Sequence, residues 1–364
     1  MIQLAGTPDL AFSLTRLMPG EDRARIDARL TRVFDQTRRR YACNPQVAPL
    51  VEEALKFTLE GGKRIRPRLC LAAYRILTQR FEPPPAPVWN VAVVLEALHA
   101  FMLVHDDLMD QSLTRRDRPT LHERYREGLN VSARTAGDLG IVAGDWMFAL
   151  AIRMLGRAGL QGTRLARVVR IIAEMLIETG LGQSLDLLHD GRSLESITEE
   201  DITTLYRWKT ARYTVSGPLV LGAALANAPA ATRRCLNRFG DLLGFGYQIC
   251  NDLESLEDDL ERGDHADLDT GKRTYVLWTA HRVLDPLGRA ALAQALEAPV
   301  GLERRRRLRD LIVRSGAVAL CRQRVHDLRN EAVELLQEAP LTVAQRQDFL
   351  ALAQLFTDMG SAAS

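Results

Sequence analysis

Residues 93–120 read VVLEALHAFMLVHDDLMDQSLTRRDRPT. The first half of this stretch is apolar at helical spacing, and it ends in Asp106, Asp107 and Asp110. Residues four apart lie one above the other on a helix, so Asp106 and Asp110 point the same way, with Asp107 beside them. The pattern therefore predicts a long core helix that ends in three clustered carboxylates.

Clustered carboxylates at the end of an apolar helix repel one another and lose solvation, and a hard cation removes that penalty. Oxygen ligands without His or Cys favour Mg²⁺, which usually binds together with a phosphate. Arg115 and Arg116 follow five residues after the last aspartate and offer bidentate contacts to phosphate. Taken alone, the stretch also fits a solvated acidic helix end whose charges neutralise each other.

Composition limits the class of protein. The chain has 364 residues, of which 46% are hydrophobic and 26% charged, as in a globular protein with a sizeable core. A net charge of +2 gives no strong attraction to nucleic acid. The five cysteines form no CxxC pair, which fits a reducing compartment and argues against a zinc site. We expect no secretion signal, no transmembrane segment and a cytoplasmic location.

Helical patterns dominate the rest of the chain. Gly and Pro cluster at breaks, and the segments between them are rich in Ala, Leu, Arg and Glu, which are good helix formers. Alternating strand patterns are nearly absent. We predict a flexible leader over residues 1–20 and a single all-α domain over residues 21–364, with a central helical bundle.

A basic turn precedes the acidic helix. Residues 61–67 read GGKRIRP, in which Gly61 and Gly62 allow a tight turn and Pro67 restarts a helix. Cations at a helix start, here including Lys63 and Arg66, oppose the macrodipole, so a bound anion is the natural explanation. By itself, the segment could also be a basic turn without a ligand.

These motifs together resemble the trans-isoprenyl diphosphate synthase (polyprenyl synthetase) family. The resemblance rests on GGKRIRP, on His99 seven residues before DDLMD at Asp106, and on RRDRPT, in this order and spacing. It continues through residues 180–186, 209–210 and 271–274 and covers roughly residues 45–280. The family implies an all-α isoprenoid synthase fold around a deep central cavity, usually in a homodimer. Enzymes of this family join isopentenyl diphosphate to an allylic diphosphate.

The resemblance also implies roles for individual residues. Those that would hold two or three Mg²⁺ ions on the allylic diphosphate are Asp106, Asp107 and Asp110. Those that would contact the same diphosphate are Arg115, Lys209 and Lys272. Those that would bind isopentenyl diphosphate are Lys63, Arg66, His99 and Arg116. Those that would line the reacting region are Thr210 and Gln248, so the predicted catalytic set is Lys209, Thr210, Gln248 and Lys272.

The second acidic motif departs from the family's DDxxD pattern. At this position the chain reads Asn251-Asp252-Leu253-Glu254-Ser255, so that one aspartate of the pattern remains. Asn251, Ser255 and Asp259 lie at i, i+4 and i+8 and would form one stripe on a helix. This stripe resembles the NDxxSxxxE metal motif of class I terpene cyclases, with Asp in the last place. We expect Asn251, Asp252, Ser255 and Asp259 to bind the remaining metal.

The altered motif leaves three functions open. The chain is a short-chain synthase, a terpene cyclase or prenyltransferase that uses a different acceptor, or a poorly active subunit of a heteromer. The apparently intact isopentenyl diphosphate set favours chain elongation, because a cyclase would not need it.

Phe101 bears on product length. It lies five residues before Asp106, about 7 Å deeper along a helix that rises 1.5 Å per residue. By resemblance to the family, an aromatic residue at this position implies a floor under the growing tail, which limits the product to C15–C20. The alternative is that Phe101 only packs in the core.

Overall fold

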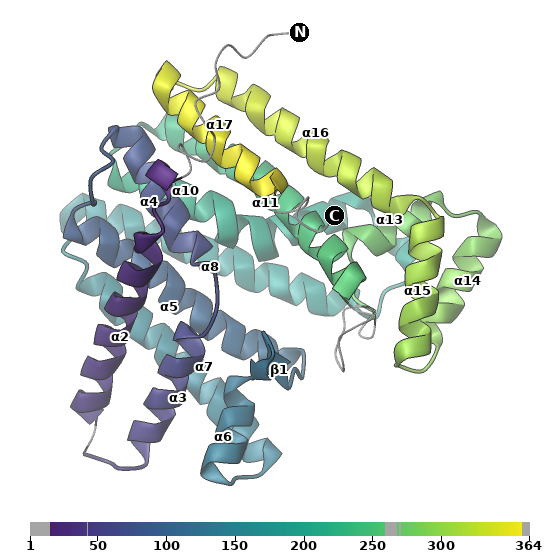
Figure 1. Ribbon diagram of the computed structural model, residues 1–364, viewed down its shortest axis with the longest axis horizontal. Coiled ribbons are helices and arrows are strands. Elements are labelled where there is room, and N and C mark those ends of the chain that lie inside the picture. The colour runs from purple at the N-terminus through teal and green to yellow at the C-terminus, as the bar shows by residue number, and fades with distance from the viewer. Residues whose placement is uncertain (1–14, 42, 259–267, 269–270, 359–364) are drawn as a thin grey trace. The chain divides into compact units, whose positions relative to one another are not determined.

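Helices form nearly all of the regular structure in residues 15–41, 43–258, 268 and 271–358, which are the residues that the computed structural model describes (Figure 1). The predicted all-α class is confirmed. The described exception is a hairpin of two short strands, β1 and β2. The chain divides into two units, Met1–Val169 and Arg170–Ser364, and each is described by itself.

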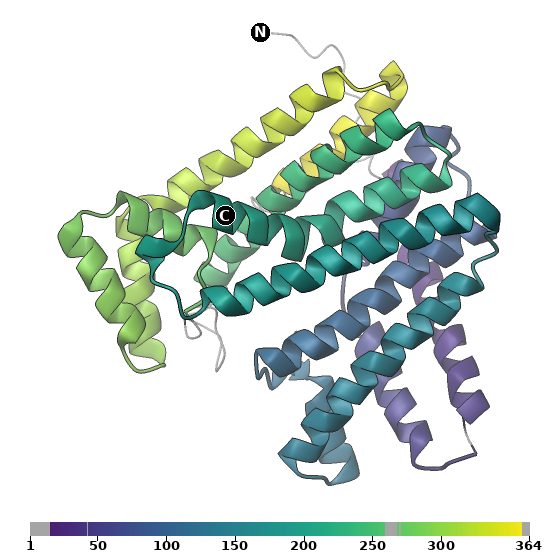
Figure 2. The same cartoon turned by 180° about the vertical axis from the view of Figure 1, so that it is seen from behind.

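Unit 1 is built around one apolar helix. Its elements in order are α2 (Glu21–Tyr41), α3 (Val47–Leu59), α4 (Ile65–Thr78), α5 (Ala86–Met109), β1 (Thr114–Arg115), β2 (Arg118–Pro119), α6 (Leu121–Leu129), α7 (Ala133–Gly156) and the first turns of α8 (Gly162–His189). Helix α5 packs along α7 and against α4, and α6 also packs against α7; the pairing of α5 with α7 can be followed from behind in Figure 2. The predicted helix over the decisive stretch is confirmed as α5.

Glycines on α7 allow the end of α5 to approach closely. A Cβ added at Gly144 would lie 2.0 Å from Nε2 of His105, and one at Gly140 would lie 3.0 Å from Cδ1 of Leu108. No larger side chain fits at Gly144 without displacing the imidazole ring. The helix end that carries the aspartates is therefore seated directly on the backbone of α7.

A buried ion pair joins α2 to α4. Arg75 donates to Oδ2 and Oδ1 of Asp22 at 2.7 and 2.9 Å, and also to the carbonyl of Leu17 at 3.0 Å. The Asp22 side chain is fully buried, and that of Arg75 is 2% exposed. Leu17 and Met18 are buried as well. These two residues, which fall within the predicted leader, therefore contribute to the core; residues 1–14 lie outside the described residues.

Unit 2 has its own core around α11. Its elements after α8 are η1 (Leu194–Ser196), α9 (Glu199–Tyr206), the π-helix η2 (Arg207–Ser216), α10 (Gly217–Leu225), α11 (Ala230–Asp258), α13 (Tyr275–Val283), α14 (Pro286–Glu297), α15 (Leu302–Arg314), α16 (Ala317–Gln337) and α17 (Val343–Asp358). Helix α11 packs along both η2 and α16. This places the altered acidic motif, near the end of α11, beside the π-helix.

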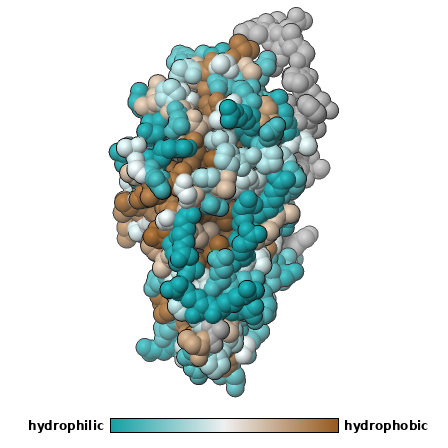
Figure 3. All heavy atoms as spheres, turned by 90° about the vertical axis from the view of Figure 1, so that its left-hand side faces the viewer, coloured by the Kyte–Doolittle hydropathy of each residue, from teal (hydrophilic) through white to brown (hydrophobic). Residues whose placement is uncertain are grey.

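Two helices of unit 1 meet a length and composition test for crossing a membrane, namely α5 and α7. In the most apolar 18-residue segment of each helix, 67% of α5 and 39% of α7 is buried inside the structure. Buried core helices of globular proteins pass the same test, so the two helices are weak support for a membrane span. Some large apolar side chains remain exposed, and Figure 3 shows hydrophobic groups among hydrophilic ones on one face.

The buried pair gives a prediction about stability. Asp22→Ala should lower the free energy of unfolding by about 3–5 kcal/mol, because it leaves the Arg75 guanidinium buried without its carboxylate. Chemical denaturation would measure the loss. As a control, Glu21→Ala removes an exposed pair with Arg25 and should cost less than about 1 kcal/mol. A loss for Asp22→Ala as small as that of the control would contradict the structural role of the pair.

Candidate active site

The three aspartates stand at the carboxyl end of α5. Asp110 caps the helix, and its N–H donates to the carbonyl of Asp106 at 2.8 Å. A helix end already carries partial negative charge from its unpaired carbonyls. Added carboxylates are therefore unfavourable here unless cations balance them.

Arg115 supplies part of that balance. Its Nε donates to Oδ1 of Asp107 at 2.6 Å, and its Nη2 donates to Oδ2 of Asp106 at 3.1 Å. The guanidinium group spans the first two aspartates and holds them in place. The structure thus brings together four of the predicted residues, including Asp110, at one end of α5.

Asp107 remains under-compensated. Its side chain is 1% exposed, and its Oδ2 has no hydrogen-bond partner. Burial raises the pKa of Asp107 to about 7, although Arg115 opposes the shift. A buried carboxylate oxygen without a donor fits a site that a cation would stabilise.

The donor set suits Mg²⁺ that shares its coordination with a ligand. Among the described residues, no group of three or more His, Cys, Asp or Glu side chains is arranged to enclose an ion. Mg²⁺ is typically bound by one or two carboxylates, with substrate phosphates and waters completing its shell. Asp106 and Asp110 provide such carboxylates on one side of the helix end.

The basic turn forms a second cluster in unit 1. Gly61 and Gly62 have φ values of 69° and 77°, and Arg116 packs on both of them. Burial lowers the pKa of His99 well below its usual value. Four guanidinium groups lower it further, those of Arg66, Arg116, Arg115 and Arg64. The predicted residues Arg66, His99 and Arg116 therefore share one strongly positive region, and Lys63 lies exposed on the turn beside it.

One cation of the basic turn has a structural role instead. Arg64 has a φ of 51°, and its side chain is 2% exposed. It donates to Oδ1 of Asp27 and to Oε1 of Glu96, both at 2.7 Å, and to the carbonyl of Leu59 at 2.9 Å. Lys63 is therefore exposed and Arg66 half-buried, while Arg64 anchors the turn to the core.

In unit 2, glycines position the π-helix that carries Lys209 and Thr210. A Cβ added at Gly182 would lie 2.4 Å from the backbone nitrogen of Lys209. Gly240 and Gly244 of α11 lie equally close to the backbone of the same π-helix. These close contacts fix its position between α8 and α11.

Lys209 and Thr210 point to different partners. The ammonium group of Lys209 forms an ion pair with Asp186 of α8. The hydroxyl of Thr210 donates to Oε1 of Gln248 at 2.9 Å. Thr210 and Gln248 therefore lie together. Asp186 belongs to the family-like stretch 180–186, so the sequence carried a signal for it.

Asp252 accepts hydrogen bonds from two neutral side chains. It accepts hydrogen bonds from the hydroxyl of Tyr206 and, at 2.8 Å, from Nε2 of Gln248. The Tyr206 hydroxyl in turn accepts from the backbone N–H of Tyr275 at 2.6 Å. No sequence pattern pointed to Tyr206, because it precedes Asp252 by 46 residues.

A pocket in unit 2 joins the altered motif to the Lys272 segment. Asp252, Ser255 and Lys272 are among its lining residues, together with Gly271 and Thr274. Asn251 lies half-buried on the same helix. Asp259, the last residue of the predicted stripe, lies outside the described residues.

Comparisons with known proteins agree with the motifs. A family model described as polyprenyl synthetase matches residues 48–312. Geranylgeranyl diphosphate synthase of Sulfolobus acidocaldarius is 31% identical over 236 residues, which cover 64% of this chain and 66% of that protein. Geranylfarnesyl diphosphate synthase of Aeropyrum pernix is 26% identical over 298 residues, which cover 80% of this chain and 88% of that protein.

A solved structure extends the similarity to the fold. Geranylgeranyl pyrophosphate synthase of Corynebacterium glutamicum, solved with isoprenyl diphosphate and magnesium, is 27% identical with a TM-score of 0.83. The superposition covers 93% of this chain and 99% of that one.

The contact between α8 and the π-helix gives a prediction. Gly182→Ala should lower the free energy of unfolding by about 1–3 kcal/mol, because the new methyl group overlaps the Lys209 backbone. Gly180→Ala is a matched control two residues away, where an added Cβ meets nothing within 4 Å. It should be neutral or stabilising by up to about 1 kcal/mol, as expected for Gly→Ala within a helix. Equal unfolding midpoints for the two variants would exclude the close packing.

Proposed function

The chain belongs to the polyprenyl synthetase family, and from this premise we propose that it condenses isopentenyl diphosphate with an allylic diphosphate. The proposed product is a short-chain, geranylgeranyl-like prenyl diphosphate of C15–C20. The named relatives are geranylgeranyl and geranylfarnesyl diphosphate synthases, which supports a short-chain transferase.

One observation carries the proposal. Unit 1 holds two clusters of opposite character next to each other, the carboxylates of α5 and the cations around His99, and Arg115 belongs to both. Two diphosphate substrates need this combination, one bound through metal ions and the other bound directly by cations. A cyclase has one diphosphate substrate and would leave the second cluster without a role.

The allylic diphosphate would bind at the carboxylate cluster. Asp106, Asp107 and Asp110 would hold two or three Mg²⁺ ions, and Arg115 would turn from the carboxylates to the diphosphate. Magnesium, when bound, stabilises the negative charge that develops on a departing diphosphate. Arg115 stabilises the same charge directly, so that the allylic group leaves as a carbocation.

Isopentenyl diphosphate would bind at the cationic cluster. Lys63, Arg66 and Arg116 supply positive charge, and His99, kept neutral by its surroundings, can donate one ring N–H. Binding at this cluster orients the double bond toward the allylic carbon. The departing diphosphate then accepts the proton, so no side chain of this chain is needed as a base.

For residues of unit 2, the proposed roles follow from the family resemblance. Lys209 and Lys272 would contact the allylic diphosphate, and Thr210 with Gln248 would line the reacting region. Asn251, Asp252, Ser255 and Asp259 would bind the remaining ion. Asp252 lies beside Thr210 and its partner Gln248, since Gln248 donates to its carboxylate, which supports a shared role for these residues.

We also propose a homodimer in the cytoplasm. Ile141, Phe148 and Ile152 are exposed on α7 and lie on one face at helical spacing, and Val142 is exposed beside Ile141. Exposed apolar side chains that gather on a helix support a protein–protein interface. A second copy of the chain, packed on α7, would cover them.

A substrate assay tests the function. The protein with Mg²⁺ and dimethylallyl, geranyl or farnesyl diphosphate should form a longer diphosphate only when isopentenyl diphosphate is present. Asp106→Asn should reduce turnover roughly 100-fold or more, because it removes a charged ligand from the reacting diphosphate. A near-normal rate for this variant would refute the metal role.

The same assay separates the alternative. The altered motif around Asn251 and Ser255 is the observation that favours a cyclase or a different acceptor. A hydrocarbon or alcohol formed without isopentenyl diphosphate would establish cyclisation and overturn the proposal of chain elongation.

Product length gives a further prediction. Phe101 stacks edge-on against Phe148 of α7, with ring centroids 5.2 Å apart, and against His105 at 5.9 Å. If Phe101 forms the floor for the growing tail, Phe101→Ala should shift the product to longer chains, measured by chromatography of the hydrolysed products. Unchanged product lengths, with activity retained, would show that Phe101 only packs between the two helices.

A further inference from the structure

The hairpin that carries Arg115 and Arg116 has an unfavourable turn. Arg115 pairs with Arg118 across the two strands, and the two residues between them, Arg116 and Asp117, have φ values of 55° and 60°. Positive φ at both central positions defines a type I′ turn, which normally takes Asn and Gly. Asp tolerates this conformation better than most residues, but Arg116 adopts it at a cost in conformational energy, so surrounding contacts must hold the turn.

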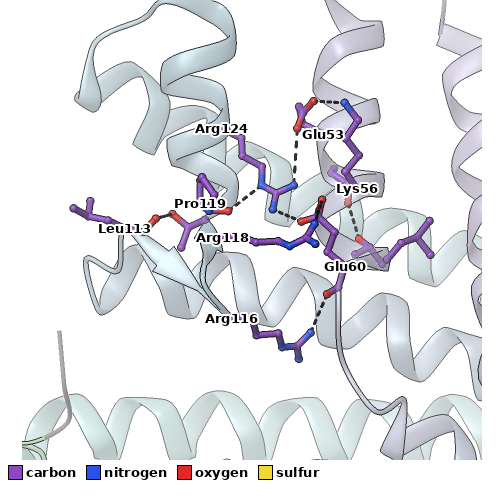
Figure 4. A network of polar contacts seen from close by, with 12 residues as sticks. Glu53, Lys56, Glu60, Leu113, Arg116, Arg118, Pro119 and Arg124 are labelled. Atoms are coloured by element: carbon purple, nitrogen blue, oxygen red, sulfur yellow. Dashed lines mark hydrogen bonds and ion pairs between the residues drawn. The ribbon is translucent and has the colours of Figure 1, made fainter. Parts of the chain in front are cut away.

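Glu60 supplies such contacts from the opposite loop. It directly precedes the Gly61–Gly62 turn and caps α3. Its Oε1 pairs with Nη1 of Arg118 at 3.1 Å, and its Oε2 forms an ion pair with Nη2 of Arg124 on α6. Its backbone carbonyl accepts a hydrogen bond from Nη1 of Arg116 at 3.1 Å. Figure 4 shows these three arginines converging on the one glutamate.

A second contact closes the arrangement. Arg124 also donates through Nε to the carbonyl of Pro119, the last residue of β2, at 2.9 Å. Glu60 and Arg124 therefore hold the second strand from two sides, one through Arg118 and the other through the backbone. Because β2 pairs with β1, this also fixes the strand that carries Arg115.

A negatively charged side chain is unexpected beside a pocket for an anion, unless it holds the surrounding arginines in place. The pocket beside it is lined by Arg115, Arg116, Arg118 and Arg124. A carboxylate in a cationic pocket weakens the attraction for a second anion. The hydrogen bond from Arg124 lowers the pKa of Glu60 despite its partial burial, so the group is ionised at neutral pH. Its charge is taken up by two arginines that the proposed substrate set does not include.

We propose that Glu60 is a positioning residue, which holds the strained Arg116–Asp117 turn against the glycine turn and so presets Arg116 for the diphosphate of isopentenyl diphosphate. The inference rests on the proposed function for the identity of this ligand. The clamp itself, meaning the contacts of Glu60 and Arg124 with the hairpin, does not depend on that function. Arg116 touches the substrate in this scheme, and Glu60 acts only through the hairpin.

Steady-state kinetics tests the effect on the substrate. Glu60→Ala should raise KM for isopentenyl diphosphate about tenfold and leave KM for the allylic diphosphate within about twofold, because the aspartates of α5, which Glu60 does not contact, would hold the allylic diphosphate through metal ions. Glu53→Ala is the matched control; it lies on the same helix, contacts Lys56 and, at 4.0 Å, Arg124, and touches neither strand. This control should leave both KM values unchanged.

A second substitution separates positioning from a loss of stability. Asp117→Gly relaxes the turn, because Gly adopts positive φ without a steric penalty. In the Glu60→Ala background, Asp117→Gly should lower the KM for isopentenyl diphosphate most of the way back to the wild-type value. The single Asp117→Gly variant completes the double-mutant cycle and accounts for the removed charge. A KM that rises equally for both substrates, or that Asp117→Gly does not restore, would overturn the proposal.

Amide hydrogen exchange tests the clamp without any assumption about activity. Backbone amides of residues 112–120 should exchange faster in Glu60→Ala than in the wild-type protein or in Glu53→Ala, and Asp117→Gly should restore their protection. Unchanged exchange in Glu60→Ala refutes the clamp even if the wild-type protein elongates prenyl chains. Faster exchange in a protein that forms no longer diphosphate supports the clamp and places the failure in the proposed function.

Discussion

Uncompensated negative charge at the carboxyl end of α5 is the constraint on which the rest of unit 1 depends. Three carboxylates stand where the helix already carries partial negative charge. Arg115 contacts two of them, and one oxygen of Asp107 still has no donor. The hairpin, the glycine turn and the contacts of Glu60 serve to bring arginines to this helix end and to hold them there.

The sequence predicted what depends on local periodicity. The all-α class, the course of α5 and the common direction of Asp106 and Asp110 follow from spacing along one helix. Side-chain roles set by long-range contacts were beyond such patterns. Lys63, Arg64 and Arg66 look alike in the sequence, but the positive φ of Arg64 turns it inward to Glu96 and Asp27.

The same limit explains the other surprises. Leu17 and Met18 lie in the core, where arginines of α4 bind their carbonyls. Arg75 binds that of Leu17, 58 residues earlier in the chain, and Arg68 binds that of Met18, 50 residues earlier. Tyr206 could not be linked to Asp252, since a π-helix and most of α11 separate them. No pattern within a single helix encodes a contact of this kind.

The two acidic motifs differ in how their aspartates are held. In unit 1 a guanidinium group holds Asp106 and Asp107, so charge balances charge. In unit 2 a phenol and an amide donate to Asp252, and the neighbouring Asn251 and Ser255 are neutral. A site with fewer negative charges attracts a divalent ion less strongly, so an ion bound there relies more on the ligand's own oxygens.

The close packing of the His105 ring on Gly144 constrains how α5 and α7 can move. Because the ring fills the notch that the glycine leaves, α5 cannot slide along its axis without taking α7 with it. A displacement of α7 along this axis would therefore also move the end of α5, where Asp106 and Asp107 directly follow His105.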